Sequence, residues 1–376
     1  MRLELTEDES FFRETVARFL DNEAAPSALR ELRADPIGHH AAYWRQAAEL
    51  GWTSLLVSEA DGGGSISGSG LLDLTLVAYE LGFHAAPGPL LSSAIVAGAL
   101  SASSGHAGAL EDLLSGATTA AWAFTEPPPD DGLTPGSTRI EEDGDELILT
   151  GTKRPVESAA SSGHLLVTGR TGDGISQVLV PAGTPGVSIH PMRSVDLTRR
   201  FDLVEFEGVR VPASAAVGEL GGSGDAVARQ LLQASVVLAA ESVGAMQKAY
   251  DITVEWAFDR YSFGRPLASY QALKARYADM TSWLHAAHGL ADEAAAAVAT
   301  GNASAARLTS AARAFIGEYG SELIQDCVQL HGGIGVTFEH DIHLYLRRHT
   351  INRSLFGSVR DHRRAVADLV IEGVAS

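Results

Sequence analysis

The chain has 376 residues, which is enough for two or three domains with a sizeable buried core. Its formal net charge of −19 and pI near 5.0 disfavour nucleic-acid and anionic-membrane partners, because either would require a basic face. The single cysteine, Cys327, excludes an intrachain disulfide, and the acidic N-terminus lacks the apolar run of a signal peptide. We therefore expect a cytoplasmic protein without membrane insertion, since no apolar run is long enough to span a bilayer.

The first part of the chain, residues 1–117, is predicted to be a helical domain. Apolar residues recur at helical spacing in FFRETVARFL (11–20). The run AAYWRQAAELGW (41–52) has a glycine near its end, as a helix does at its C-cap, and LLDLTLVAYELG (71–82) repeats that pattern. The mildly apolar run PLLSSAIVAGAL (89–100) is predicted to be a buried helix.

The second part, residues 118–222, changes to the period of β-strands. Short β-prone runs are separated by Gly, Pro and Asp turns, which is typical of an all-β sandwich or barrel. These runs are AAWAFTE (120–126), ELILTGTK (146–153), HLLVTGR (164–170), SQVLVPA (176–182) and DLVEFEGVRVP (202–212).

The last part, residues 223–376, returns to a helical pattern. Its first helix, predicted over residues 225–261, is too long for an ordinary surface helix and is better suited to a bundle, and three more helices follow. The predicted fold class is therefore α+β, mostly α, with a compact β-domain between two helical domains.

Arg260, Phe263 and Gln271 belong to the run RYSFGRPLASYQ, where the long helix is predicted to stop at Gly264 and Pro266. Arg260 and Phe263 are then displayed on its last turn, where a guanidinium can bind a phosphate bidentately and a ring can stack on a planar ligand. Taken alone, a C-capping arginine beside a core phenylalanine is the commoner arrangement.

Gln329, Gly332 and Gly333 belong to a second run, QLHGGIG. Adjacent glycines after a helix let a ligand or another backbone approach closely, and a glutamine can hydrogen-bond an adenine or ribose edge. As a lone glycine-rich turn this is a weak signal.

Three histidines near Asp341 raise the alternative of a metal site; they are His331, His340 and His343. No second cluster matches them, and solvated or capping histidines are commoner, so we predict no metal.

A third stretch, Phe124-Thr125-Glu126-Pro127, leaves a predicted strand. Its hydroxyl and main-chain amides could contact a flat ring, whereas the ordinary interpretation is a proline-stiffened turn.

Together these motifs resemble the acyl-CoA dehydrogenase family. The resemblance covers the whole chain: AELGW and a GG loop, FTEP and FEGVRVP, and finally RYSFGRPLASYQ, ADM, QLHGGIG and EHDIHLYLRR. It implies an N-terminal helical domain, a middle β-barrel or sandwich domain, a C-terminal four-helix bundle and a tetramer built of dimers. It also implies FAD as cofactor, oxidation of an acyl-CoA thioester at its α,β carbons, and an electron-transferring flavoprotein or similar acceptor.

The resemblance also identifies where a catalytic base is missing. Many family members carry a Glu just before a Gly-Thr or Gly-Ser in the C-terminal turn, and Phe356 stands at that position here. A second subgroup carries the Glu on the long helix, where this chain has Ala234. Glu241 lies two helical turns beyond Ala234 on the same face, so it is a weak candidate for the base. The alternative is that Glu241 pairs with a basic or hydroxyl neighbour.

The side that holds the flavin ring in the family is altered as well. The family presents a Trp-(Ile/Val)-(Ser/Thr) run to the ring; here its Trp falls at Pro155 and its hydroxyl at Glu157. The glycine and serine expected after TEP are replaced by PPDDG (128–132).

These losses follow one pattern. In the family's dimer, one chain holds the flavin ring and supplies the base, while its neighbour's Arg-x-x-Phe-Gly and Gln-x-x-Gly-Gly motifs hold the ADP half of FAD. This chain keeps the second set and loses the first. The sequence therefore predicts the base-lacking subunit of a heteromeric acyl-CoA dehydrogenase, with a homologous subunit as partner. The alternatives are a self-sufficient homotetramer that uses Glu241 or another acid, and a flavin-free scaffold or binding protein on the same fold.

Overall fold

The computed structural model describes residues 5–128, 136–172 and 174–375. Their contacts divide the chain into two compact units. The helical unit comprises Met1–Leu29, Thr75–Ala86 and Ser235–Ser376, and the sheet unit comprises Arg30–Leu74 and Pro87–Ala234. The N-terminal helices, predicted as one domain, are thus shared between two units by their contacts. The predicted junctions at residues 117 and 222 lie between helices and strands.

The sheet unit is built on seven hydrogen-bonded strands in the order β1-β4-β2-β3-β7-β6, with β5 paired to β4. Neighbouring strands pair antiparallel except β1 and β2, which each run parallel to β4. The strands are β1 (Ala120–Ala123), β2 (Arg139–Asp143), β3 (Glu146–Glu157), β4 (His164–Thr171), β5 (Gly174–Pro181), β6 (Val187–Pro191) and β7 (Phe201–Pro212). Each of the five predicted β-prone runs overlaps one of these strands, and β2 and β6 were not predicted.

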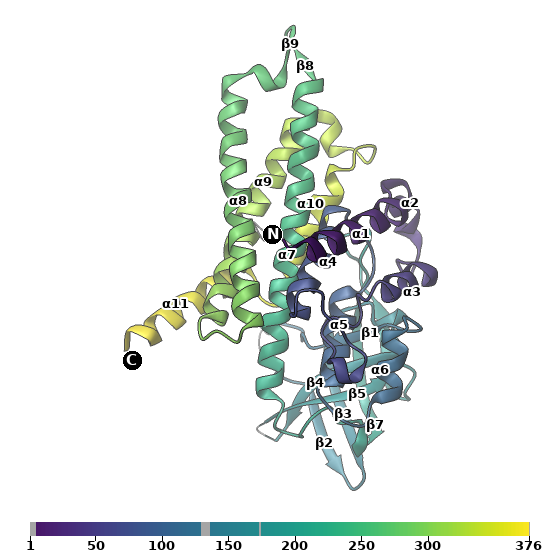
Figure 1. Cartoon of the computed structure of the whole chain (residues 1–376). Coiled ribbons are helices and arrows are strands. Elements are labelled where there is room, and N and C mark those ends of the chain that lie inside the picture. The colour runs from purple at the N-terminus through teal and green to yellow at the C-terminus, as the bar shows by residue number, and fades with distance from the viewer. Residues whose placement is uncertain (1–4, 129–135, 173, 376) are drawn as a thin grey trace. The chain divides into compact units, whose positions relative to one another are not determined.

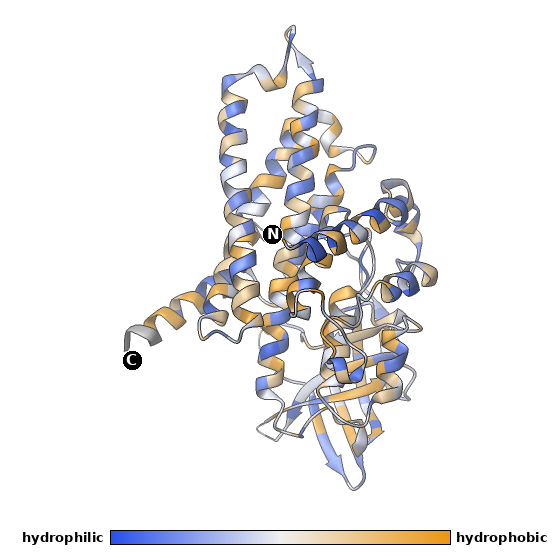
Figure 2. Ribbon diagram, viewed as in Figure 1, coloured by the Kyte–Doolittle hydropathy of each residue, from blue (hydrophilic) through white to orange (hydrophobic). Residues whose placement is uncertain are grey.

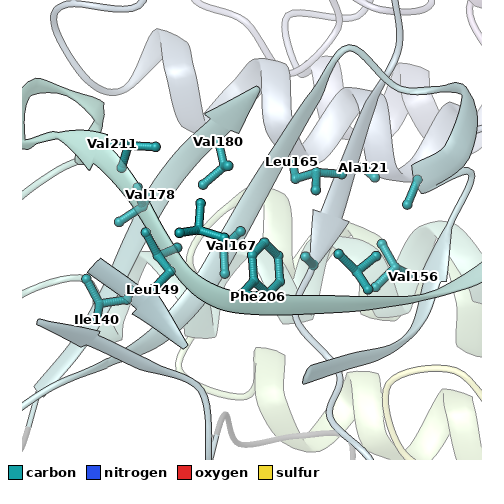
Figure 3. Packing of buried hydrophobic residues seen from close by; sticks show 14 of the residues in the cluster. Ala121, Ile140, Leu149, Val156, Leu165, Val167, Val178, Val180, Phe206 and Val211 are labelled. Carbon is teal, nitrogen blue, oxygen red and sulfur yellow. The ribbon is translucent and has the colours of Figure 1, made fainter. Parts of the chain in front are cut away.

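The core of the sheet unit forms because side chains alternate along each strand. Alternate residues of β4 and β5, such as Leu165, Val167, Val178 and Val180, pack around Phe206 of β7 (Figure 3). Three helices complete this unit: α3 (Ala41–Glu49), α5 (Leu90–Ser101) and α6 (Ala107–Leu114). The predicted buried helix at 89–100 is α5, which packs on β1 and α6.

The helical unit is dominated by long helices, whose successive turns alternate between hydrophilic and hydrophobic residues (Figure 2). Helices α8, α10 and α11 pack on α9, and α7 is joined to α8 by a 2.7 Å hydrogen bond between Tyr250 and Thr281. The chain's remaining helices are α1 (Glu7–Glu23), α2 (Pro26–Glu31), α4 (Gly70–Phe83), α7 (Gly224–Asp259), α8 (Gln271–Ala299), α9 (Ala305–His331), α10 (Ile342–Asn352) and α11 (Val359–Ala375). In the described part of the chain, none of the helices has both the length and the apolar character needed to cross a membrane.

Helices α4 and α7 cross with their backbones in contact. A Cβ atom on Gly82 would clash with the main-chain oxygen of Glu241, and one on Gly244 would clash with that of Tyr79. Two glycines therefore allow this close approach, which fixes the position of Glu241 at the crossing.

Candidate functional site

Phe263 lies at the tip of a tight hairpin that follows α7. The helix ends at Asp259, two residues before the predicted end at residue 261, so Arg260 and Phe263 lie beyond the helix and not on its last turn as predicted. Strand β8 (Tyr261–Ser262) pairs with β9 (Arg265–Pro266), and the two residues between them have φ angles of 50° and 80° (Figure 1). Positive φ at both central positions is the pattern of a type I′ turn.

The side chain of Phe263 is 98% exposed, so the alternative of a core phenylalanine is wrong. A left-handed conformation costs a residue other than glycine roughly 1–2 kcal/mol. Full exposure of an aromatic ring also forgoes the free energy of burying it. The structure thus places an uncovered aromatic ring at a strained backbone position.

Arg260 is exposed beside this hairpin, and its Cζ atom lies 5.8 Å from the centroid of the Trp256 ring. Within the described residues it forms no ion pair with a carboxylate. Its guanidinium donors are therefore available to an anion. Gln271, the first residue of α8, is likewise exposed, and Tyr270 before it donates a 2.6 Å hydrogen bond to the oxygen of Ser262 in the hairpin.

Gly332 and Gly333 begin a short 3₁₀ helix, η6 (Gly332–Val336), at the end of α9. A Cβ atom added to either glycine would have no neighbour within 4 Å, whereas one on Gly335 would lie 2.5 Å from the oxygen of Val328. Gly335 is therefore required for packing, while the first two glycines leave their backbone open to an incoming molecule. Gln329, on the last turn of α9, is exposed.

The two motifs meet at Trp256, although they are distant in sequence. The Trp256 ring stacks on His331 with a centroid separation of 5.3 Å and an interplanar angle of 25°. His331 directly precedes Gly332, and Arg260 lies one helical turn after Trp256. Trp256 was not singled out in the sequence; the available signal was its position four residues before Arg260 on a predicted helix.

The histidines near Asp341 form ring contacts. The centroids of His331 and His340 are 4.3 Å apart, and His343 lies 4.9 Å from Phe338. Among the residues that the structure describes, no group of three or more His, Cys, Asp or Glu side chains could hold a metal ion.

The turn that contains Phe356 keeps its shape without an acid. Phe356 has a φ angle of 51° and Gly357 one of 96°. Arg313 of α9 is buried, and its Nη2 donates 2.7 Å hydrogen bonds to the oxygens of Asn352 and Leu355. The guanidinium of Arg313 thus holds the backbone of this turn through two hydrogen bonds.

Ser358, the hydroxyl of this turn, caps helix α11. Its N–H and Oγ donate to the carboxylate of Asp361 at 3.0 and 2.5 Å, and Asp361 N–H donates back to Ser358 Oγ at 3.3 Å.

Two imidazoles flank Arg313, namely His349 and His362, and burial lowers the pKa of each to about 4. Both rings are therefore neutral at pH 7.

The two other positions considered for the base lie on α7. Ala234 is fully buried and has no titratable group. Glu241 is buried, and its Oε1 pairs with Nη1 of Arg348 at 2.7 Å. Nη2 of Arg348 also donates to the oxygens of Ala85 and Ala86 at 3.1 and 2.8 Å. Glu241 therefore belongs to an ion pair that joins α7 to α10 and to the end of α4. This agrees with the alternative prediction that Glu241 pairs with a basic or hydroxyl neighbour.

In the sheet unit, the position expected to carry a hydroxyl is occupied by a buried ion pair. Glu157 Oε1 accepts a 2.6 Å bond from Nε of Arg199, and its Oε2 accepts a 3.2 Å bond from Ser92. Arg199 also lies 5.3 Å from the ring of Phe201. Both charges of the pair are satisfied within the chain.

The FTEP stretch is also bonded internally. Glu126 accepts a 2.8 Å bond from the fully buried Lys153, and further bonds from Ser137 and Thr138. Burial acts to raise the pKa of Glu126, but Lys153 and the backbone donors outweigh it and hold the pKa well below its ordinary value. Of the PPDDG substitution, residues 129–132 lie outside the described part of the chain.

Comparison with known proteins agrees with this geometry. Residues 6–108 match the family model "Acyl-CoA dehydrogenase, N-terminal domain", and residues 222–371 match "Acyl-CoA dehydrogenase, C-terminal domain". The chain is 31% identical to acyl-CoA dehydrogenase IpdE2 of Mycobacterium tuberculosis, over 97% of this chain and 98% of that protein. The chain belongs to the acyl-CoA dehydrogenase family. Membership confirms the predicted fold class, the FAD cofactor and an oxidoreductase that acts on acyl-CoA.

Two solved structures resemble nearly the whole chain. The ChsE4–ChsE5 complex from Mycobacterium tuberculosis matches with a TM-score of 0.88 and 25% identity, over 99% of both chains. A variant of the Tcur3481–Tcur3483 steroid acyl-CoA dehydrogenase matches with a TM-score of 0.88 and 27% identity, over 98% of this chain and 99% of that one.

Proposed function

We propose that this chain is the base-lacking subunit of a heteromeric FAD-dependent acyl-CoA dehydrogenase. It contributes Arg260, Phe263, Gln271, Gln329 and the Gly332–Gly333 backbone to the ADP half of FAD. A homologous partner subunit supplies the contacts to the flavin ring and the catalytic base. The observation that carries this proposal is a contrast: among the described residues, the exposed ADP-side side chains of Arg260, Gln271 and Gln329 form no hydrogen bond, whereas the ring-side residues Glu157 and Arg199 are bonded to one another.

The residues at the ADP side fit the chemistry of that half of FAD. A pyrophosphate requires cationic and N–H donors, which Arg260 and the backbone of Gly333 can provide, while the N–H of Gly332 already donates to the main-chain oxygen of Gln329. An adenine or ribose offers an edge to the exposed amide of Gln329 and a flat face to Phe263.

The residues at the ring side do not fit a flavin ring. Glu157 and Arg199 are both buried and already hydrogen-bonded to each other at 2.6 Å. Admitting a ring at this position would separate the two charges, and breaking a buried ion pair costs about 3–5 kcal/mol. A bound FAD would supply the acceptor for the hydride that leaves the β-carbon of the acyl-CoA. In this proposal the flavin ring rests on the partner's β-domain.

The α-proton must also be removed by the partner. Phe356 has no group that can accept a proton, and the buried carboxylate of Glu241 is already paired with Arg348. This chain contributes the shape of the turn around Phe356, which Arg313 maintains through two hydrogen bonds.

Two of the structural relatives support a heteromeric assembly. One is a complex of ChsE4 with ChsE5, and the other joins Tcur3481 with Tcur3483 and is named a steroid acyl-CoA dehydrogenase. We therefore propose a bulky, steroid-type acyl-CoA as substrate and an electron-transferring flavoprotein or similar protein as electron acceptor.

Co-expression with each homologous acyl-CoA dehydrogenase from the same genome tests the proposal. A mixed complex that contains FAD and oxidises an acyl-CoA is expected with one of them, while the chain purified alone should hold no stoichiometric FAD. One FAD per chain together with turnover by the isolated protein would favour the homotetramer. A complex that stays colourless with every partner would favour the flavin-free scaffold.

A further inference from the structure

The ring of Trp256 lies between the two motifs assigned above to the ADP half of FAD. We propose, on the basis of that assignment, that Trp256 is a positioning residue. It holds the guanidinium of Arg260 and the backbone of Gly332 and Gly333 at the separation that an adenosine diphosphate group requires. It belongs to neither motif and makes no contact with FAD itself.

On one side, Trp256 limits the directions available to Arg260. The two residues are one helical turn apart, and Arg260 N–H donates a 2.9 Å hydrogen bond to the main-chain oxygen of Trp256. The Arg260 Cζ atom lies 5.8 Å from the indole centroid, where the negative face of the ring attracts a cation. Arg260 is otherwise exposed, so this contact reduces the side-chain freedom that ligand binding would have to remove.

On the other side, Trp256 fixes the start of the glycine turn. Its ring stacks on His331 at 5.3 Å, and His331 Nδ1 lies 2.7 Å from the oxygen of Cys327, one turn earlier on α9. His331 directly precedes Gly332, whose φ angle of 64° turns the chain out of the helix. A change in the Trp256 ring would therefore move both phosphate-binding elements.

The polar atoms of this stack argue against a role in packing alone. Trp256 Nε1 and His331 Nε2 are buried, and neither has a hydrogen-bond partner among the described residues. Burial lowers the pKa of His331, and in the neutral ring the Nδ1 that faces the Cys327 carbonyl carries the proton, which leaves Nε2 as an acceptor. Two unmet polar atoms weaken a contact that two apolar side chains could make without that cost. The stack is therefore better explained by where it places the Trp256 ring than by a contribution to the stability of the fold.

Trp283 offers a matched control within the same unit. It lies on α8, its ring is 5.5 Å from Tyr319, and Arg276 lies 4.9 Å above it. Trp283 therefore has an aromatic ring and an arginine as neighbours, as Trp256 does, and Trp256 has in addition the His340 ring at 6.3 Å. In the described part of the chain, Tyr319 and Arg276 are the ring contacts of Trp283.

The experiment measures the dissociation constant of FAD for the co-expressed complex by flavin fluorescence. Trp256→Leu is expected to weaken FAD binding at least tenfold, and Trp283→Leu by less than twofold. Near-equal affinity of Trp256→Leu and the unchanged complex would overturn the proposal.

A double-mutant cycle separates positioning from general stability. Arg260→Ala should weaken FAD binding at least tenfold in the unchanged chain, but less than threefold when Trp256 is already leucine, because the guanidinium has then lost its orientation. Equal factors in both backgrounds would show that Trp256 does not act through Arg260. If Trp256→Leu does not fold, the cycle is run with Trp256→Phe, where purely additive losses again overturn the proposal.

Different results would contradict the proposed function and the proposed role of Trp256. Absence of FAD from every complex of the unchanged chain removes the proposed function itself. FAD bound by the unchanged chain, together with additive mutations, removes only the role of Trp256.

Discussion

The carboxylate of Glu241 and the guanidinium of Arg348 form a buried ion pair, with Oε1 and Nη1 2.7 Å apart. The same arginine donates to two main-chain oxygens at the end of α4, so the pair joins three helices. Because an unpaired buried charge is costly, both side chains are needed together.

Glu241→Gln should destabilise the protein by about 3–5 kcal/mol, because it leaves the Arg348 charge buried without its partner. The change is measured as the free energy of unfolding in urea. A second substitution, Arg348→Met, made on top of it should recover part of the loss. In the assembled enzyme, turnover per bound flavin should stay within twofold of the unchanged complex. Unchanged stability with abolished turnover would instead identify Glu241 as the base.

Phe263→Asn should improve the hairpin while impairing the proposed cofactor contact. Asparagine tolerates the left-handed conformation, and Asn-Gly is the preferred pair for a type I′ turn, so stability should rise by up to about 1 kcal/mol. FAD affinity of the co-expressed complex should fall at least fivefold because the exposed ring is lost. Thermal unfolding and flavin fluorescence measure the two effects. A loss of both stability and affinity would mean that the ring serves the hairpin itself.

Three alanine substitutions at the glycine turn should have distinct effects. Gly333→Ala places its Cβ in open space, so unfolding should be unchanged while FAD binding weakens at least fivefold. Gly332→Ala adds a strain of roughly 1–2 kcal/mol from its positive φ. Gly335→Ala forces its Cβ against Val328 and should destabilise α9 before any effect on the cofactor is seen. Normal FAD binding by Gly333→Ala would contradict the proposed approach of the ligand to this backbone.

Arg313→Met should loosen the turn around Phe356. The substitution leaves the oxygens of Asn352 and Leu355 without their donor, at about 1–3 kcal/mol for each buried group. Hydrogen exchange of the amides in residues 352–357 should accelerate, and the unfolding temperature should fall. Arg363→Met is the control, because its pair with Glu318 is exposed and such pairs contribute about 0–1 kcal/mol. Equal behaviour of the two variants would contradict a clamp by Arg313.

Stability should depend on pH through Glu126. Its pKa is lowered in the folded protein, so its stabilising contribution is complete above the ordinary value of 4.5 and is lost progressively as the pH falls below it. Glu126→Gln should lower the free energy of unfolding at pH 7 by about 3–5 kcal/mol, because Lys153 keeps a buried charge. It should also flatten the decline between pH 5 and pH 3. Urea unfolding across this range measures both, with the exposed Glu142→Gln as control. A steeper decline in the variant would contradict this account.

The sequence predicted the parts of the fold that depend on local pattern. The apolar character of the buried strands was recognisable, but β2 and β6 were not, because RIEED has a single apolar residue and the alternation in VSIHP covers only four residues. The stop after α7 was signalled by Gly264 and Pro266, whereas the hairpin was not, since Phe263 is an unusual residue for a left-handed position.

The site could be predicted only as far as the residues of its two motifs. Their meeting at Trp256 depends on the packing of α7 against the end of α9, which no local pattern encodes. The pairing of Glu157 with Arg199 likewise depends on the fold, which brings the end of β3 to the segment before β7. The partner of Glu241 was anticipated in kind, although its identity, Arg348, required the helix crossing.

The serine of the Gly-Ser signature in the Phe356 turn, Ser358, has a structural role that does not depend on catalysis. The hydroxyl begins α11 through its reciprocal bonds with Asp361, so folding alone is sufficient reason to keep it. The side chain at position 356, two residues earlier, takes no part in these bonds. Proton transfer and helix initiation are therefore separable demands on two positions of one turn, and a chain can meet the second without the first. Surveys that count dehydrogenase active sites by this signature would count such chains as complete enzymes.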